Sequence, residues 1–250
     1  MEEGQEPKTR MDEAAHRGLP SYIWRAGQER RFQMVRQWTE LSGRRVLDVG
    51  CGVGMYTEAF LRETPHVFGV EIEHDRAIEA RAHAKDVVEG IGEQLPFADS
   101  SFDVVFSHEV LEHVTDDRAC VDEMARVARP QARIVIFVPN RLYPFETHGV
   151  FWRGRYRFGN VPLINWLPDR LRDQLAPHVR AYTSRDLRRL LQGLPLRVIH
   201  HSQIYPGYDN VVARAPRLGR MLRRVTYALE RTLLRAFGLS HFLVAEKEAP

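Results

Sequence analysis

The stretch RRVLDVGCGVGMYT, residues 44–57, decides the fold of this 250-residue chain. Residues 46–49 form a short apolar run typical of a buried strand, and glycines follow at alternate positions, 50, 52 and 54. Glycine has no Cβ and tolerates positive φ, so a loop of this kind lets a ligand lie against the backbone. Residues 55–61 then predict the opening of a helix. We therefore expect the first strand, loop and helix of a nucleotide-binding α/β unit.

The spacing of the glycines distinguishes between nucleotides. A dinucleotide fingerprint, G-x-G-x-x-G/A, requires glycine or alanine where this chain has Met55. Asp48 precedes the first glycine by two residues, where it repels a pyrophosphate and attracts a ligand ammonium group. The chain here resembles the class I S-adenosylmethionine (SAM) dependent methyltransferases, whose first motif is an acid followed by G-x-G-x-G. The resemblance implies that SAM is the cofactor, although the loop alone also fits a tight turn without a ligand. The implied cofactor contacts in this motif are Asp48, Gly50, Gly52 and Gly54.

A second acidic position lies at the end of the next predicted strand. Residues 66–73 (HVFGVEIE) favour a strand, and Glu71 follows Asp48 by about 20 residues, the offset of an acceptor for ribose hydroxyls. In the methyltransferase family this acid is the ribose ligand. We therefore expect Glu71 to bind the ribose of SAM, the alternative being an ordinary carboxylate at a strand end.

Residues 90–114 (GIGEQLPFADSSFDVVFSHEVLEHV) resemble the small-molecule branch that includes ubiquinone and menaquinone methyltransferases. Those enzymes often carry Asp or Asn shortly before this motif for the adenine amino group, whereas this chain has Ile91. Backbone groups of Ile91 and Gly92, with the Glu93 side chain as a weaker candidate, are then the expected adenine contacts. Ser107 ends the fourth predicted strand, where cofactor and acceptor should meet, because ligands bind outside the carboxyl ends of strands in open α/β sheets.

Histidines are the candidate bases. SAM carries its methyl group on a positive sulfonium, so the protein mainly aligns the reactants. A hydroxyl acceptor must also lose a proton, and histidine accepts one at neutral pH. The candidates by position are His148 and His108, with His178 as a third; each alone is also compatible with a packing role.

Glu109, Glu112 and His113 form a second constellation, at i, i+3 and i+4. On a helix this spacing places the three side chains on one face, where they are able to bind a divalent metal. The string also resembles the metal-binding segment of some ubiquinone-biosynthesis O-methyltransferases, but it occurs widely in the superfamily without metal. We therefore expect no metal and keep these residues as candidates.

The remaining pattern predicts a Rossmann-like, seven-stranded α/β sheet with helices on both faces. Residues 1–19 look like a disordered tail, and 20–250 like a single methyltransferase domain. Within it, the aromatic residues 141–182 interrupt the alternation and are expected to be a substrate-shaping insertion or lid. The predicted strands are 46–49, 66–73, 86–88, 103–107, 133–138, 196–202 and 241–246.

Composition restricts the partners. With only two cysteines and no signal peptide or long apolar run, the chain is expected in the cytoplasm. The net charge is +3, but arginines gather around a predicted basic amphipathic helix within residues 212–237. Its apolar face either packs on the domain or docks on an anionic membrane, which would make the protein membrane-peripheral. No nucleic-acid-binding module is evident, SHEV replaces an N-P-P-Y-like motif after the fourth strand, and no oligomeric state is predicted.

The sequence thus predicts a SAM-dependent methyltransferase. Its expected acceptor is a small molecule with a hydroxyl group, such as a phenol, a quinol precursor or a glycolipid. One alternative is a catalytically silent SAM-binding regulatory module. A nucleotide-dependent oxidoreductase is a second alternative, which the glycine spacing disfavours.

Overall fold

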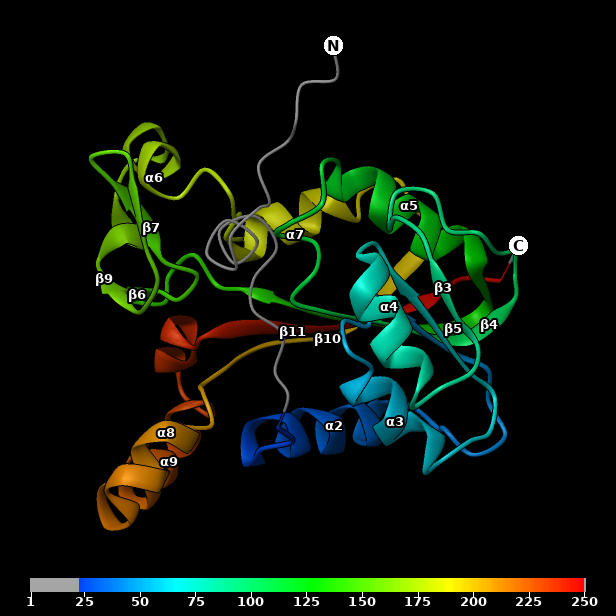
Figure 1. Cartoon of the computed structure of the whole chain (residues 1–250), viewed down its shortest axis with the longest axis horizontal. Helices are drawn as coiled ribbons and strands as arrows, with labels where there is room; N and C mark the ends of the chain where they lie inside the picture. Colours follow the sequence, from blue (N-terminus) through cyan, green and yellow to red (C-terminus); the bar gives the residue numbers. More distant parts are fainter. Residues whose placement is uncertain (1–22, 250) are drawn as a thin grey trace.

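A computed structural model describes residues 23–249 of the chain (Figure 1). The segment that opens the fold behaves as its sequence predicts: β1 (Val46–Val49) is fully buried and α3 (Met55–Leu61) begins directly after the glycine loop. The predicted tail, residues 1–19, lies outside the described residues. The other elements of the main body are α2 (Ala26–Trp38), β2 (Val67–Glu71), α4 (His74–Arg81), β3 (Val87–Glu89), β4 (Phe102–His108), α5 (Asp117–Val127), β5 (Ala128–Pro139), α7 (Ser184–Leu190), β10 (Leu196–Ile204) and β11 (Ser240–Lys247).

One seven-stranded sheet runs through the molecule in the order β10-β11-β5-β4-β1-β2-β3. The pairs β3–β2, β2–β1, β1–β4 and β4–β5 are parallel, whereas β11 is antiparallel to both of its neighbours. The chain leaves β1 toward β2 on one side and returns as β4 on the other. The strand order therefore reverses between β1 and β4, where open α/β sheets form a ligand crevice.

Helices cover both faces of this sheet, which confirms the predicted fold class (Figure 1). On one face, Phe32 and Val35 of α2 and Phe60 of α3 pack against Phe106 and Phe137 of the sheet. The opposite face buries α5 and α7, whose contributing side chains are Cys120, Val121, Met124, Leu187 and Leu190. The two layers of apolar side chains supply the main stabilising burial and hold the carboxyl ends of β1, β2 and β4 in fixed positions.

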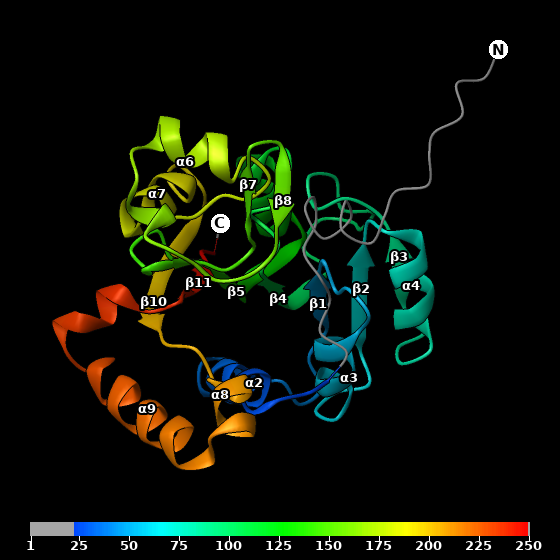
Figure 2. The same ribbon diagram turned by 60° about the vertical axis from the view of Figure 1, so that its left-hand side comes forward.

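The insertion, residues 141–182, has a structure of its own. Its short strands pair as two small antiparallel sheets, β6 with β9 and β7 with β8. A buried ion pair joins Arg172 to Glu146, with 3.0 Å between Nη2 and Oε2. Figure 2 shows the insertion standing at one end of the main sheet. Its elements are β6 (Phe145–Glu146), β7 (Val150–Trp152), β8 (Arg155–Arg157), β9 (Val161–Pro162), the 3₁₀ turn η1 (Ile164–Trp166) and α6 (Asp169–Leu175).

The prediction of one continuous basic helix within residues 212–237 is wrong. The segment is broken into α8 (Asp209–Arg214), α9 (Pro216–Leu229) and the 3₁₀ turn η2 (Leu233–Phe237). Pro216 starts a new helix at its first position, since proline has no N–H for a preceding turn. Thr232 caps the last piece by accepting a hydrogen bond from the Leu234 N–H. Among the described residues, none of these helices or any other is long and apolar enough to span a bilayer.

Candidate functional site

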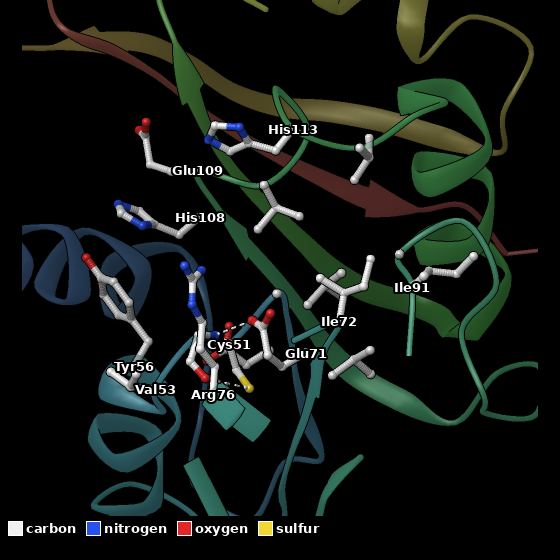
Figure 3. Close-up of a pocket in the computed structure, with 18 of the residues that line it drawn as sticks. Cys51, Val53, Tyr56, Glu71, Ile72, Arg76, Ile91, His108, Glu109 and His113 are labelled. Atoms are coloured by element: carbon white, nitrogen blue, oxygen red, sulfur yellow. Dashed lines mark hydrogen bonds between the residues drawn. The ribbon is translucent and has the colours of Figure 1, made fainter. Parts of the chain in front are cut away.

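A cavity of about 560 Å³ lies at the carboxyl ends of β1, β2 and β4. This volume suits a ligand of nucleotide size. The sheet supplies the floor through the glycine loop, and the insertion contributes Thr147, His148 and Phe158 to the wall. Figure 3 shows Glu71, Ile72, Tyr56, His108, Glu109 and His113 around this space. Residues predicted from distant parts of the sequence therefore line one cavity.

The three glycines of the loop, Gly50, Gly52 and Gly54, meet different structural requirements. All three have positive φ, and at Gly52 a Cβ would meet nothing within 4 Å, so this backbone is open to the cavity. A Cβ at Gly50 would lie 2.4 Å from Cγ2 of Val110, which packs over the turn. At Gly54 the Cα of Ala80 in α4 would be 3.1 Å away. The loop therefore presents bare backbone to a ligand at Gly52 and uses the other two glycines for close packing.

Glu71 is fixed beside this loop by two backbone donors. The N–H of Gly52 donates to its Oε2 (2.8 Å), and the N–H of Glu73 donates to its Oε1 (3.0 Å). The side chain is buried but lines the cavity, and each carboxylate oxygen retains a lone pair for another donor. Two hydroxyl groups of a ribose are suitable donors, so the site fits the nucleoside part of the cofactor implied by the glycine motif.

Asp48 lies deeper. Its Oδ2 accepts a hydrogen bond from Oγ1 of Thr57 (2.7 Å), and the residue is almost completely buried. Burial raises the pKa of this carboxyl to about 7, the nearby Glu71 charge adds to the rise, and the Thr57 hydroxyl opposes it. A carboxylate in such a position is stabilised by a cationic ligand, because the positive charge offsets the desolvation.

The expected adenine region forms part of the same cavity. Ile91, Gly92 and Glu93 all line it, as does Ile72, which the sequence reasoning missed although it directly follows the ribose acid. A Cβ at Gly92 would lie 2.7 Å from Sγ of Cys120, so only glycine lets this segment approach α5. The Glu93 carboxylate accepts the backbone N–H of Thr115 (2.8 Å), so this side chain holds a loop at the rim of the cavity.

Ser107, which the sequence also predicts to contact the cofactor, is not part of the cavity wall. It is completely buried in β4, does not line the cavity, and its hydroxyl has no hydrogen-bonding partner among residues 23–249. His108, one residue on, does face the cavity (Figure 3). Burial lowers the pKa of His108 to about 4, so its imidazole is neutral at physiological pH, and its Nε2 is unpaired within the described part of the chain.

His148 is held by the insertion. The carboxylate of Glu146 accepts hydrogen bonds from its backbone N–H (3.0 Å) and from Nδ1 of its ring (3.2 Å). Burial opposes ionisation of Glu146, but the contacts with His148 and Arg172 outweigh it, so its pKa lies below the usual value. Because an ionised carboxylate only accepts, Nδ1 is the donor and Nε2 is left as the proton-accepting atom. His178 does not line the cavity; its Nε2 approaches the backbone oxygen of His148 at 3.3 Å.

The three metal candidates, Glu109, Glu112 and His113, do not lie on a helix. The chain from Glu109 to His113 is a turn, not a helix, and Glu109 adopts a left-handed φ of 57°. Its Oε1 accepts a hydrogen bond from Ser240 (3.0 Å). The structure instead brings His148 to Glu112 and His113, with one ligand atom from each of the three within 4.8 Å of the others.

Glu112 is the most unusual member of this group. Both of its oxygens are buried without a hydrogen-bonding partner among the described residues, and Nδ1 of His113 is likewise unpaired. Burial, reinforced by the charge of Glu109, raises the pKa of Glu112 well above its usual value. Burial also lowers the pKa of His113 to about 3. The donor set suits either a protonated carboxyl beside neutral imidazoles or a divalent cation.

The comparisons with known proteins agree with this geometry. Residues 47–136 match the family described as "Methyltransferase domain". A ubiquinone biosynthesis O-methyltransferase of Xylella fastidiosa (strain M23) is 33% identical over 118 residues, covering 44% of this chain and 48% of that protein. An uncharacterized methyltransferase of Mycobacterium sp. (strain JLS) is 38% identical over 129 residues, covering 50% and 47%. The chain thus spans about half the length of the curated relatives it matches.

Solved structures share the fold over most of the chain. The crystal structure of an S-adenosylmethionine dependent methyltransferase from Mesorhizobium loti superposes with a TM-score of 0.62 at 17% identity, covering 88% of this chain and 98% of that one. The matched family segment, 47–136, contains the glycine loop, Glu71 and the turn that carries Glu112. Over this segment the chain is similar to the methyltransferase-domain family.

Proposed function

We propose that the protein is a SAM-dependent methyltransferase that transfers a methyl group to a hydroxyl oxygen of a small molecule. The observation that carries the proposal is that the glycine loop, Glu71 and His148 line one cavity. In this proposal the one cavity holds both the nucleoside of the cofactor and a proton acceptor, His148. The names of the relatives and the matched family support it.

The cofactor would be bound by groups of known geometry. Glu71 would accept the ribose hydroxyls, Gly52 would offer its open backbone, and Asp48 would lie near the cationic amino-acid part. When bound, SAM supplies a methyl group on a positively charged sulfur. The protein's own contribution is to hold that group in line with the acceptor oxygen and to exclude water.

His148 is the proposed base. Its Nδ1 is fixed by Glu146, so its Nε2 is directed away from that carboxylate and is free to accept the hydroxyl proton as the new oxygen–carbon bond forms. The neutral His108, which also lines the cavity, is the second candidate. Aromatic Phe158 and Tyr56 favour an acceptor with an apolar body, such as a phenol, a quinol precursor or a glycolipid. We also propose, from the basic segment 212–237, that such acceptors are met at an anionic membrane.

His148 has a second candidate role, as a ligand of a divalent cation together with Glu112 and His113. The unpaired oxygens of Glu112 favour this role. Such an ion would lower the pKa of a bound hydroxyl. The sequence favours no metal. Removal of divalent cations with a chelator separates the two roles, because only the second requires the ion.

The proposal is tested by incubation of the protein with methyl-labelled SAM and a panel of phenols and catechols as acceptors. A second incubation replaces this panel with a lipid extract of a bacterial membrane. A labelled product whose amount depends on the protein is the expected result. Tight SAM binding with no labelled product from any acceptor would favour the silent regulatory module, and the oxidoreductase alternative requires NAD binding in place of SAM.

A further inference from the structure

The outer side of α9 carries an apolar stripe that no described element covers. Leu218, Met221 and Val225 lie at i, i+3 and i+7, which places them on one side of the helix, and about half of each side chain is exposed. Gly219 is the only residue of α9 that is buried, against Val212 of α8. The sequence left open whether this apolar face packs on the domain. In the structure these three residues do not pack on it.

Arginines form a second stripe directly beside the first. Arg217, Arg220 and Arg224 have the same i, i+3, i+7 spacing one position earlier, and none has an ion-pair partner within residues 23–249. Arg223 behaves differently, because it faces inward and pairs with Asp209 at 2.8 Å. Figures 1 and 2 show α8 and α9 extending away from the sheet. The exposure of both stripes shows that this side of α9 faces solvent.

The exposed apolar surface continues from α9 into η2. Leu233 is 91% exposed and Leu234 is about half exposed. Phe237, at the end of the turn, contacts the exposed Trp166 of the insertion, with 6.2 Å between ring centroids. Two further arginines, Arg231 and Arg235, flank this part, and both are exposed. We define the α9–η2 face as Leu218, Met221, Val225, Leu233 and Leu234 with Arg217, Arg220, Arg224, Arg231 and Arg235.

We propose that the α9–η2 face docks on the surface of an anionic lipid membrane, with the apolar stripe inserted at the headgroup level and the arginines on lipid phosphates. Arginine beside an exposed apolar stripe, with no acidic residue on the face, is complementary to such a surface. A second copy of the chain is disfavoured, because a symmetric contact brings these arginines against each other. A nucleic acid is disfavoured because it leaves Leu218, Met221 and Leu233 in water.

The contact between Phe237 and Trp166 gives this docking a consequence for the cavity. The insertion supplies His148 and Phe158 to the cavity wall and Trp166 to the edge of the α9–η2 face. Docking therefore sets the insertion, and not only the helix, at the lipid surface. The inference rests on the proposed membrane contact and is independent of methyl transfer, because lipid binding is measured without SAM.

The test is sedimentation of the full chain with vesicles of phosphatidylcholine, alone or with phosphatidylglycerol. We expect binding to the anionic vesicles that is lost at high salt. Changing Arg217, Arg220 and Arg224 together to Gln should weaken partitioning roughly tenfold or more, since each cation near such a surface contributes measurably. A matched control changes three exposed arginines of α7, Arg185, Arg188 and Arg189, to Gln and so alters the net charge equally.

A second pair of variants tests the apolar part. Leu233→Ser with Leu234→Ser should also weaken binding, whereas Ile78→Ser, at an exposed apolar position on α4, should not. Unchanged thermal melting shows that each variant folds. The proposal is overturned if the native chain ignores anionic vesicles, or if the α7 control loses as much binding as the α9 variant. It is also overturned if the Leu233/Leu234 variant only converts a dimer to a monomer in sedimentation velocity.

Discussion

The backbone N–H of Gly52 donates a hydrogen bond to Oε2 of Glu71, with 2.8 Å between the two atoms. This bond joins the loop after β1 to the end of β2 and fixes the two parts of the chain that a nucleoside would contact. It also leaves the carboxylate able to accept further donors from a ligand. The preformed pair predicts that the cofactor site exists before the cofactor arrives.

Glu71→Gln should weaken SAM binding about 10- to 100-fold, since hydrogen bonds to a charged group contribute about 1.5–3 kcal/mol. The isosteric amide retains one acceptor oxygen, which keeps the bond from the Gly52 N–H, whereas its NH2 group cannot accept the N–H of Glu73. Calorimetric titration with SAM measures the loss. The matched control is Glu89→Gln, at an exposed strand-end carboxylate paired with His74, which should leave the affinity unchanged. Equal affinities for the native chain and Glu71→Gln would remove Glu71 from the site.

Binding of SAM should depend on pH through Asp48. Burial raises the pKa of Asp48 to about 7, so near neutrality much of the free protein carries a proton there. A cationic ligand binds the ionised form and releases that proton. The affinity should therefore rise as pH increases from about 6 to about 8 and level off above it. Calorimetry in buffers of different ionisation enthalpy measures the released proton.

The matched variant for this effect is Asp48→Asn. It should bind SAM more weakly at pH 8 and show little dependence on pH, because the titrating group is gone. An affinity of the native chain that stays constant between about pH 6 and 8 would mean that Asp48 does not exchange a proton on binding.

His148→Ala should lower kcat by about 10²- to 10⁴-fold, the usual contribution of a general base, while SAM affinity stays within a factor of about two. The single-turnover rate with labelled SAM separates this step from product release. Treatment of the native chain with EDTA should leave turnover unchanged. If turnover falls and Mg²⁺ restores it, His148 acts with Glu112 and His113 on a cation instead. A normal rate in His148→Ala would leave His108 as the base.

Arg172→Met should destabilise the insertion. Its guanidinium is buried with Glu146, and removing one partner of a buried ion pair costs about 3–5 kcal/mol. Urea unfolding should show the loss, and limited proteolysis should cut within residues 141–182 first, because the pair connects β6 to α6. The exposed ion pair of Arg62 with Glu58 provides the control, since Arg62→Met should cost less than about 1 kcal/mol. Similar losses in both variants would contradict this assignment.

Local patterns in the sequence were enough for the sheet and its loop. Residues 46–49 and 55–61 were predicted with the boundaries that the structure has, because a short apolar run and alternate glycines are local signals. Four of the cofactor candidates line the cavity for the same reason, since strand ends of one parallel sheet meet at one edge: Asp48, Gly50, Gly52 and Glu71. Gly54 does not line it and instead packs against Ala80 of α4.

Local sequence patterns do not predict contacts between segments that are distant in the sequence. The approach of His148 to Glu112, and the support of His148 by Glu146 and Arg172, depend on how the insertion folds back over the sheet. The sequence left open whether the segment from Glu109 is a loop or a helix, because i, i+3, i+4 spacing does not reveal a left-handed residue. The break of the basic helix did have a local signal, Pro216, which starts helices more readily than it continues them.

The most direct test of the central claim is calorimetric titration of the native chain and of Gly52→Arg with SAM, with S-adenosylhomocysteine and NAD as competitors. A Cβ at Gly52 points into open space, so an arginine side chain should extend into the cavity. The left-handed φ of 56° adds local strain, so thermal melting must show that the variant is folded. We predict that the native chain binds SAM and S-adenosylhomocysteine and not NAD, and that Gly52→Arg binds none of them. No binding of SAM by the native chain, together with tight binding of NAD, would contradict the account.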